Sequence, residues 1–285
     1  MEIHQLRYAA AVADTGSFTA AAEAVKVSQS GVSTQVQKLE RELGVALFDR
    51  SGRRVVLTAD GERMLPAIRE SLRALDGIRT TAADLRGLLL GSLRVGTVSG
   101  LTWPRLFDAL GELHTAHPGL EIRLREHTSD GLIDALRHGE LDIAVVAWAQ
   151  HPPAGLETIT LFDDPLVAVV APDHPWASRR GIRAAELDGV DVIALPHGTG
   201  DRAALEQLRP GLEPRWEVST PWFIERLAAR GLGVGVVSDA TRRRWHQVRA
   251  MPVQAPEVRS RLGIAWRPSP SRAACALRDL LAPQS

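Results

Sequence analysis

Residues 17–44 read SFTAAAEAVKVSQSGVSTQVQKLERELG, and their apolar spacing decides the fold of the N-terminal part. Apolar residues recur at steps of three and four on both sides of a short polar break, a pattern typical of two amphipathic helices joined by a tight turn. Ser28 is a good start for the second helix, because its hydroxyl can accept a hydrogen bond from a free backbone N–H of the first turn. Gly44 can end that helix in the left-handed conformation. The stretch therefore predicts a helix-turn-helix.

Short patterns before and after this stretch complete a small domain. Residues 6–13 repeat apolar side chains at three and four and predict a preceding helix, while residues 48–57 read as a tight, arginine-bearing turn that enters a short strand. Such a turn beside a helix-turn-helix is typical of a wing that touches the backbone or minor groove of DNA. We expect an all-α domain with a small wing over residues 1–58. An interaction-only three-helix domain is the alternative.

The outward face of the second predicted helix carries uncharged hydrogen-bonding side chains, whereas its other face is apolar. Amide and hydroxyl groups of this kind can contact base edges and phosphates, and arginines in a wing can contact phosphates. Residues 26–54 hold six basic and three acidic residues, an excess that equally fits an ordinary surface. We predict DNA contacts from Ser28, Gln29, Ser30, Ser33, Thr34 and Gln37 in the helix and from Arg50, Arg53 and Arg54 in the wing.

Residues 59–90 predict one long helix with a narrow apolar stripe. Thr58 is a plausible N-cap, and Pro66 should bend the helix within its first turns. The apolar steps average about 3.5 residues, which is the spacing of a coiled-coil seam, so we expect the helix to dimerise. Packing of the stripe on the protein's own domains is the alternative. The stripe consists of Leu65, Ile68, Leu72, Leu75, Ile78 or Arg79, Ala82, Leu85 and Leu89.

From residue 92 onward, segments with the apolar pattern of a strand alternate along the chain with segments that have the three- and four-residue apolar spacing of a helix. This alternation predicts an α/β architecture with largely parallel sheets, in which ligands bind beyond the carboxyl ends of strands. The expected strands are residues 93–97, 120–124, 141–147, 166–170, 190–195 and 232–237, and the expected helices are residues 106–113, 132–136 and 221–229.

Polar residues follow several of the expected strands. Ser99 with Gly100, and Thr128 with Ser129, come directly after a strand and at the expected start of a helix, where free N–H groups favour an anion such as a carboxylate. N-capping explains any one of these hydroxyls alone, but three such junctions favour a ligand cleft. The third junction holds His197 and Thr199, and Trp148 is either a wall of the cleft or part of the core.

Composition excludes several classes of protein. The 285 residues suit about two domains, the 34 basic and 34 acidic residues balance, and the one cysteine, Cys275, permits neither an intramolecular disulfide nor a multi-cysteine metal site. No catalytic signature is complete, and no histidine pattern predicts a metal site, so we expect no catalytic residue, metal or cofactor. Without an export signal or an apolar run of bilayer length, we expect a cytoplasmic protein with no membrane partner.

Five short runs together resemble the DNA-binding domain of LysR-type transcriptional regulators. They are SFTAAAE (17–23), SQSGVSTQV (28–36), LERELG (39–44), LFDR (47–50) and LT (57–58). The resemblance extends over the whole chain. It implies a winged helix-turn-helix (1–58), a dimerising linker helix (59–90) and an effector-binding α/β domain (91–285). In that family the last domain has two subdomains like those of periplasmic solute-binding proteins, here residues 92–161 with 267–285, and residues 162–266.

The resemblance implies a regulator, not an enzyme, that binds double-stranded promoter DNA as a homodimer through the linker helix, and we expect a homotetramer. A small effector, which we expect to be an anionic metabolite, would lie between the subdomains, where the family's motifs match Ser99, Gly100, Thr128, Ser129, His197 and Thr199 and add Thr220. Many relatives have arginine where this chain has Thr34, so one charged contact with DNA is expected to be missing. A cytosolic small-molecule-binding or enzymatic α/β protein with a helical cap, and an interaction scaffold, are the competing hypotheses.

Overall fold

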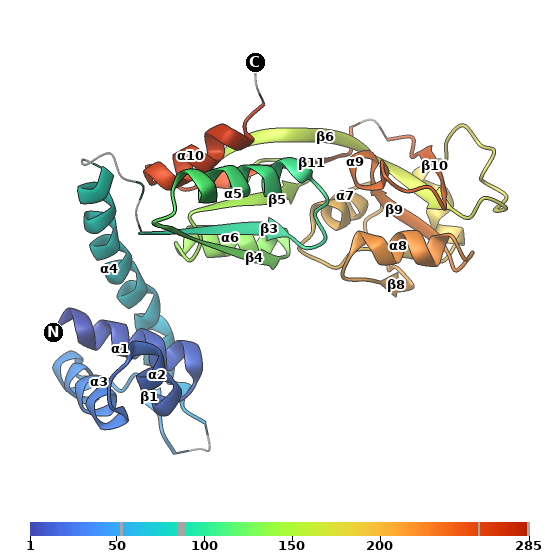
Figure 1. Cartoon of the computed structure of the whole chain (residues 1–285). Coiled ribbons are helices and arrows are strands. Elements are labelled where there is room, and N and C mark those ends of the chain that lie inside the picture. Colours follow the sequence, from blue (N-terminus) through green and yellow to red (C-terminus); the bar gives the residue numbers. More distant parts are fainter. Residues whose placement is uncertain (52–53, 85–88, 90, 256, 284–285) are drawn as a thin grey trace. The chain divides into compact units, whose positions relative to one another are not determined.

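The chain folds into two units, Met1–Arg86 and Gly87–Ser285, each with its own hydrophobic core (Figure 1). The computed structural model describes the chain except for residues 52–53, 85–88, 90, 256 and 284–285. The predicted Arg53 and the stripe residue Leu85 therefore lie outside the described residues. No helix among the described residues is long and apolar enough to cross a membrane.

The N-terminal unit is a winged helix-turn-helix, as the apolar spacing predicts. Ser17 and Ser28 cap the second and third helices through their hydroxyls, and Gly16 and Gly44 end the first and third in the left-handed conformation. Two short antiparallel strands form the base of the wing. The elements are α1 (Ile3–Thr15), α2 (Phe18–Val25), α3 (Gln29–Leu43), β1 (Phe48–Asp49), β2 (Val56–Leu57) and α4 (Ala59–Asp84).

The apolar stripe of α4 serves two purposes, which corrects the expectation of one continuous seam. Ile68 is 5% exposed in the core of the N-terminal unit, and Leu72 packs against that core, whereas Ile78 is 67% exposed. Leu89 lies beyond the described end of α4 and packs against the core of the C-terminal unit. The first half of the stripe is therefore core, whereas Ile78 faces away from the core of its own unit.

The C-terminal unit alternates strands and helices as expected. Its first half comprises β3 (Gly91–Val98), α5 (Pro104–Ala116), β4 (Leu120–His127), α6 (Ser129–Arg137) and β5 (Ile143–Trp148). The chain continues through β6 (Glu157–Val170), the 3₁₀ turn η1 (Ala184–Gly189), β7 (Val192–Ala194), α7 (Gly200–Leu208), β8 (Trp216–Glu217) and α8 (Pro221–Ala228). It ends with β9 (Val234–Ser238), α9 (Asp239–Arg242), β10 (Arg249–Pro252), β11 (Arg259–Trp266) and α10 (Arg272–Leu281).

The sheet is mixed, which corrects the expectation of largely parallel strands. In the part of the chain that the structure describes, the strand order is β4-β3-β5-β11-β6-β9-β7-β8, with β10 also paired to β6. β3 pairs parallel with β4 and β5, and β7 with β8 and β9, but β6 and β11 pair antiparallel with all their neighbours. β6 and β11 join the two halves of the sheet, so the halves share strands (Figure 1).

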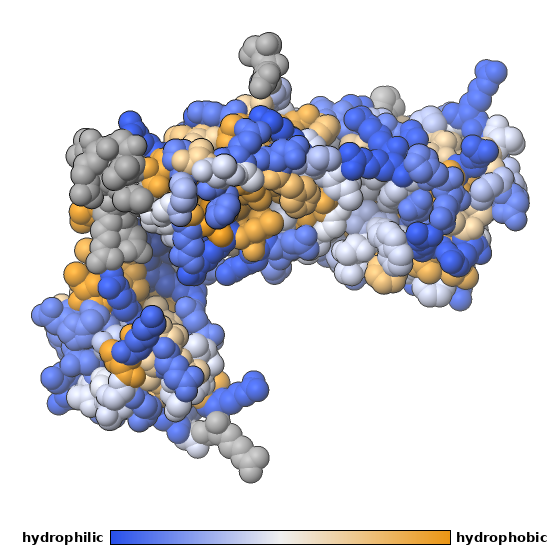
Figure 2. Space-filling view, viewed as in Figure 1, coloured by the Kyte–Doolittle hydropathy of each residue, from blue (hydrophilic) through white to orange (hydrophobic). Residues whose placement is uncertain are grey.

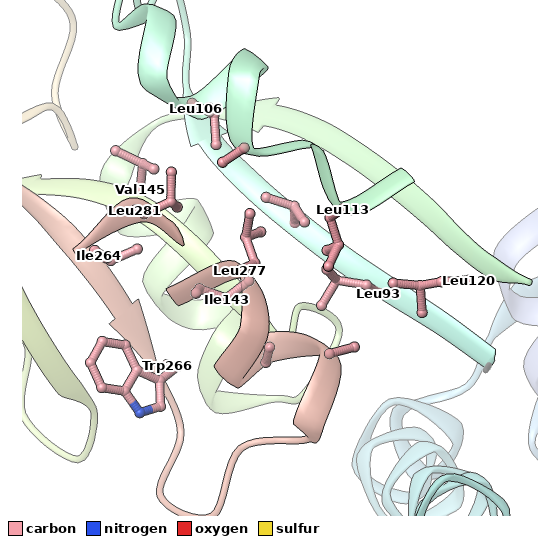
Figure 3. Packing of buried hydrophobic residues seen from close by; sticks show 14 residues of the cluster. Leu93, Leu106, Leu113, Leu120, Ile143, Val145, Ile264, Trp266, Leu277 and Leu281 are labelled. Carbon is pink, nitrogen blue, oxygen red and sulfur yellow. The ribbon is translucent and has the colours of Figure 1, made fainter. Parts of the chain in front are cut away.

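Helices cover both faces of the first half of this sheet. α5 and α10 pack on one face through a cluster that includes Leu106, Leu277 and Leu281 (Figure 3). α6 packs on the other face through Leu132 and Leu136. These layers fix the carboxyl ends of β3, β4 and β5, which is where the predicted ligand-binding residues of this half lie.

Candidate DNA interface and effector site

The exposed face of α3 carries most of the residues predicted to contact DNA. Val32, Val36 and Leu39 are fully buried against α1 and α2, so the opposite side of the helix faces outward. A helix held rigidly on one face and polar on the other can enter the major groove. On the outward side, Ser33 is half-buried, whereas Gln29, Ser30, Thr34 and Gln37 are exposed.

Ser28 performs a structural task at the start of α3. Its Oγ accepts from the Gly31 N–H at 3.2 Å, and the Ser30 hydroxyl lies 3.3 Å from the same oxygen. The cap leaves Ser28 exposed, so a phosphate contact through its side chain remains compatible with this geometry. Gln5, which carried no signal in the sequence, is buried and donates to Gln35 Oε1 at 3.1 Å, and thereby ties α1 to α3.

The wing arginines differ in how far they are already engaged. Arg50 Nη2 is 2.7 Å from Glu40 Oε2, and its guanidinium lies 4.6 Å from the centre of the Phe18 ring. Glu40 also accepts from the Leu47 N–H, so Arg50 helps to fix the wing on α3. Arg54 is exposed. Of the two wing arginines that the structure describes, Arg50 is thus less available than Arg54 for a contact with DNA.

Ser99 and Gly100 form a turn after β3, and α5 begins only at Pro104. The expectation that Ser99 starts a helix is therefore wrong, because Trp103 occupies the N-cap position. Gly100 has a φ of +73°, and a Cβ there would lie 3.0 Å from Pro221 Cδ and 3.5 Å from Thr220 Cβ. This turn thus meets the start of α8 from the other half of the unit.

Thr128 and Ser129 begin α6, as expected from the sequence. The Thr128 Oγ1 accepts from the Gly131 N–H at 3.4 Å. Ser129 is 2% exposed, and its hydroxyl accepts from the Ala147 N–H at 2.9 Å, which fixes α6 on β5. The Gly198 carbonyl accepts from the Asp130 N–H at 3.1 Å. A loop of the second half therefore already occupies a first-turn donor of α6.

His197 and Thr199 lie in that loop, just before α7. The Thr199 hydroxyl donates to the Pro196 carbonyl at 2.8 Å and does not cap α7. His197 Nδ1 is 2.7 Å from Glu206 Oε1, and its Nε2 is 3.1 Å from Arg202 Nη2. Arginine only donates hydrogen bonds, so a hydrogen bond in the Arg202 contact requires His197 Nε2 to accept.

Trp148, at the end of β5, is a core residue beside this loop. Its ring is 6% exposed and packs over Gly263, where a Cβ would come within 2.4 Å of it. A Cβ at Gly200 would come within 2.4 Å of Ala147 Cβ and 3.2 Å of the Trp148 backbone nitrogen. The structure therefore brings α7 against β5 and Gly100 against Thr220. Gly198 likewise meets Thr128 and Asp130, and we call this set of contacts the junction.

Comparison with known proteins identifies both units. A family model described as a bacterial regulatory helix-turn-helix protein of the lysR family matches residues 3–62, and the LysR substrate binding domain matches residues 86–285. The chain belongs to the LysR family of bacterial transcription regulators. It is therefore a transcription regulator with an effector-binding domain and not an enzyme. The C-terminal unit of this chain has the expected two-subdomain fold.

Individual LysR relatives match over most of the chain. The transcriptional activator CmpR of Synechocystis sp. is 32% identical over 83% of this chain and 78% of its own length. The DNA-binding transcriptional dual regulator OxyR of Escherichia coli is 30% identical over 95% of this chain and 92% of its own. The structure of a full-length OxyR variant from Pseudomonas aeruginosa superposes with a TM-score of 0.77 at 32% identity, over 98% of this chain and 94% of that one.

Two charged residues of this LysR regulator escaped the sequence analysis. Arg202, in the first turn of α7, is 2% exposed, and its Nε donates to Glu206 Oε1 at 2.7 Å. Its Nη1 is buried 3.6 Å from Glu217 Oε2 and makes no hydrogen bond with the described residues. Asp201, beside it, is 7% exposed and accepts from the Ser260 hydroxyl at 2.7 Å. Their neighbours come from β8 and β11, which the sequence pattern did not predict.

Proposed function

We propose that this LysR regulator reads promoter DNA with the outward face of α3 while the wing contacts the sugar–phosphate backbone. The observation that carries the proposal is the division of α3 into a fully buried apolar face and an exposed face of amide and hydroxyl groups. The base-reading set is Gln29, Ser30, Ser33, Thr34 and Gln37, with Ser28 at the helix start and Arg50, Arg53 and Arg54 in the wing.

The regulator binds DNA as a dimer joined through α4, and two dimers form a tetramer. Exposed Ile78 supports the first contact, since Leu65 and Ile68 are buried and Leu72 packs against the core of the N-terminal unit. Paired reading helices would contact two half-sites about one helical turn, roughly 34 Å, apart. In this proposal the DNA-binding domain ends near residue 58 and the linker helix near residue 90. The first subdomain of the effector domain gives way to the second near residue 161.

A small anionic effector binds at the junction and changes DNA binding. At the start of α6 the Asp130 N–H donates to the Gly198 carbonyl, and Arg202 of α7 carries a positive charge that pairs with Glu206. An anion at α6 would replace the Gly198 carbonyl on the Asp130 N–H, and would thereby release the loop that carries His197 and Thr199. The single cysteine allows no intrachain disulfide, so a bound molecule is the signal that we propose.

A salt titration tests the wing. Replacing both Arg53 and Arg54 with Gln should weaken binding to every DNA sequence by a similar factor, because phosphate contacts carry no base information. The slope of log K against log salt should become shallower by about 2, about 1 for each lost phosphate contact. The control exchanges the exposed Arg123 and Arg180 for Gln, which removes equal charge from the C-terminal unit. An unchanged slope in the wing variant would refute the wing contact.

A thermal-shift screen of small carboxylates tests the effector site. A ligand at 100 times its Kd should stabilise the protein by about 2.7 kcal/mol, since it binds only the folded state. The variant Thr128→Val should lose the shift while retaining operator binding, and Thr115→Val, at an exposed position of α5, should keep both. An equal shift in all three proteins would remove Thr128 from the site.

A further inference from the structure

A small pocket lies at the edge of the sheet, between α6 and β4, the outermost strand of its half (Figure 1). Its volume is about 210 Å³, below the range of about 300–1,000 Å³ that is usual for drug-sized ligands, so it suits a molecule of few heavy atoms. Leu132 and Ala135 of α6 supply its apolar lining. None of the residues assigned to DNA or effector binding lines this pocket.

Two histidines line the pocket, and their contacts with the backbone give them opposite hydrogen-bonding roles. The Thr128 N–H donates to His127 Nδ1 at 2.8 Å, so the proton of the neutral ring lies on Nε2, which is a donor. His138 Nδ1 lies 2.8 Å from the Asp134 carbonyl, and a carbonyl only accepts. This hydrogen bond therefore places the proton of His138 on Nδ1 and leaves Nε2 as an acceptor.

The imidazole of His127 is held in place by the first turn of α6. A Cβ at Gly131 would lie 2.2 Å from His127 Nδ1, so a ring in this position requires glycine there. The hydrogen bond from Thr128 fixes the same nitrogen. A side chain that is already held in this way loses little conformational entropy when a ligand binds to it.

The pocket also carries charges of both signs. Arg125 Nη1 of β4 lies 3.6 Å from Glu140 Oε2, farther than the roughly 2.7–3.2 Å of a hydrogen bond. The Arg125 side chain is 60% exposed, so this pair is screened by solvent and easily exchanged. The carboxylate of Asp134 lines the pocket as well. A ligand with both a carboxylate and an ammonium group can therefore find a partner for each.

Such a ligand matches the pocket better than a simple ion does. A carboxylate alone would lie beside the carboxylates of Asp134 and Glu140, and an ammonium group alone would lie beside Arg125. A metal ion needs several lone pairs, whereas only one of the two imidazoles offers one. The described part of the chain holds no group of three or more His, Cys, Asp or Glu side chains suited to a metal ion.

We propose that this pocket is a second small-molecule site, and that its ligand is a small aliphatic α-amino acid in its zwitterionic form. The carboxylate of the ligand pairs with Arg125 and accepts from His127 Nε2. Its ammonium group pairs with Asp134 and donates to His138 Nε2, and its short side chain lies against the apolar lining of α6. The site uses none of the residues assigned to the effector, so the two sites can succeed or fail separately.

Calorimetric titration of the full-length protein with L-alanine tests the proposal, with propionate and ethylamine as comparison ligands. Propionate has the carbon chain of alanine without the ammonium group, and ethylamine lacks the carboxylate. Alanine should bind. Each comparison ligand should bind at least about fivefold more weakly, because each lacks one of the two exposed ion pairs.

Two variants test the two ends of the ligand separately. Arg125→Gln should weaken alanine binding by about fivefold without weakening ethylamine binding. Asp134→Asn should weaken alanine binding by a similar factor without weakening propionate binding. Arg123→Gln, which removes a similarly exposed charge from the same strand, is the matched control and should bind alanine normally.

Two further variants separate the pocket from the junction. Ala135→Phe places a ring in the pocket and should abolish alanine binding, whereas Thr220→Val, whose side chain makes no cap hydrogen bond, should leave it unchanged. Unchanged thermal unfolding and operator binding would show that each variant is folded. Absence of alanine binding at millimolar concentration, equal binding of alanine and propionate, or binding that is lost in Thr220→Val but kept in Arg125→Gln would overturn the proposal.

Discussion

At the scale of single residues, Asp201 is a buried carboxyl group in the first turn of α7. Its carboxylate accepts from the Ser238 N–H at 3.1 Å and from the Ser260 hydroxyl at 2.7 Å, and so links α7 to β9 and β11. Thr241 adds a third donor at 3.3 Å. Burial outweighs these hydrogen bonds and raises the pKa of Asp201 above its ordinary 3.8.

Replacing Asp201 with Asn should therefore change how stability depends on pH. In the wild type, a raised pKa means that the contribution of Asp201 is full below pH 3.8 and is lost as pH rises through the folded-state pKa. Asparagine has no such titration, and its amide can accept from Ser238 and donate to Ser260. The unfolding free energy of the variant relative to wild type should rise from pH 4 toward pH 7 in urea melts.

The control for this experiment has the opposite sign. A hydrogen bond from Arg259 lowers the pKa of Asp163, so its contribution is present above 3.8 and is lost as pH falls through the lower folded-state value. Asp163→Asn should thus cost stability near pH 7 and little at the acid end. A difference for Asp201→Asn that stays constant with pH would refute the buried-charge interpretation.

Sequence reasoning reached some of these residues and missed others for a physical reason. Ser28 and Thr128 were found as caps because capping depends only on residues three positions away. Ser129, by contrast, is buried, and its hydroxyl accepts a hydrogen bond from the Ala147 N–H. The burial of Asp201 and Arg202 was not predicted from the sequence. Their environments are built by strands that are distant in the sequence, and no local spacing reveals which charge a fold will bury.

At the scale of elements, α4 joins two functions on one helix. Ile68 belongs to the core of the N-terminal unit, whereas Ile78, three turns later, is exposed. The heptad-like spacing is continuous through both, so it could not distinguish a residue that packs on its own unit from one that meets a second chain. The pattern within a strand likewise does not show which strand will lie beside it or in which direction. The antiparallel pairing of β6 and β11 could therefore not be predicted from the sequence, and it corrects the expected parallel sheet.

Two substitutions in α4 should separate these roles. Ile68→Ala should lower the unfolding free energy of the N-terminal unit by about 2–4 kcal/mol, because it leaves a cavity in a packed core. Ile78→Asp should leave that stability nearly unchanged but dissociate the α4 dimer. Chemical denaturation and sedimentation velocity measure the two effects. A dimer that survives Ile78→Asp would place the self-association of this regulator elsewhere.

At the scale of the whole molecule, the C-terminal unit exposes several large apolar side chains to solvent. Trp222 and Phe223 on α8 are 54% and 46% exposed, with their rings 5.1 Å apart. Phe107 on α5 is 52% exposed, and Figure 2 shows apolar residues gathered over the α5 side of this unit. Contiguous exposed apolar patches are typical of protein contacts, so the adjacent rings of Trp222 and Phe223 support the proposed assembly of dimers into a tetramer.

Replacing Trp222 and Phe223 together with Ser should therefore convert tetramers into dimers. The expected result is a halved mass in sedimentation equilibrium, with the α4 dimer and the secondary structure preserved. Val56→Ser is the control, because Val56 is equally exposed but lies in the wing. If the α8 variant remains a tetramer at micromolar concentration, these aromatic residues do not hold the dimers together.

The central claim, that paired α3 helices read promoter DNA, is tested most directly by enrichment of fragments from the source genome on the full-length protein, followed by footprinting. Gln29→Ala combined with Ser33→Ala serves as the comparison protein. The account predicts a shared sequence with two protected half-sites whose centres are about one helical turn apart, together with loss of that enrichment in the variant. Fragments with no common sequence, or equal enrichment by both proteins, would contradict it.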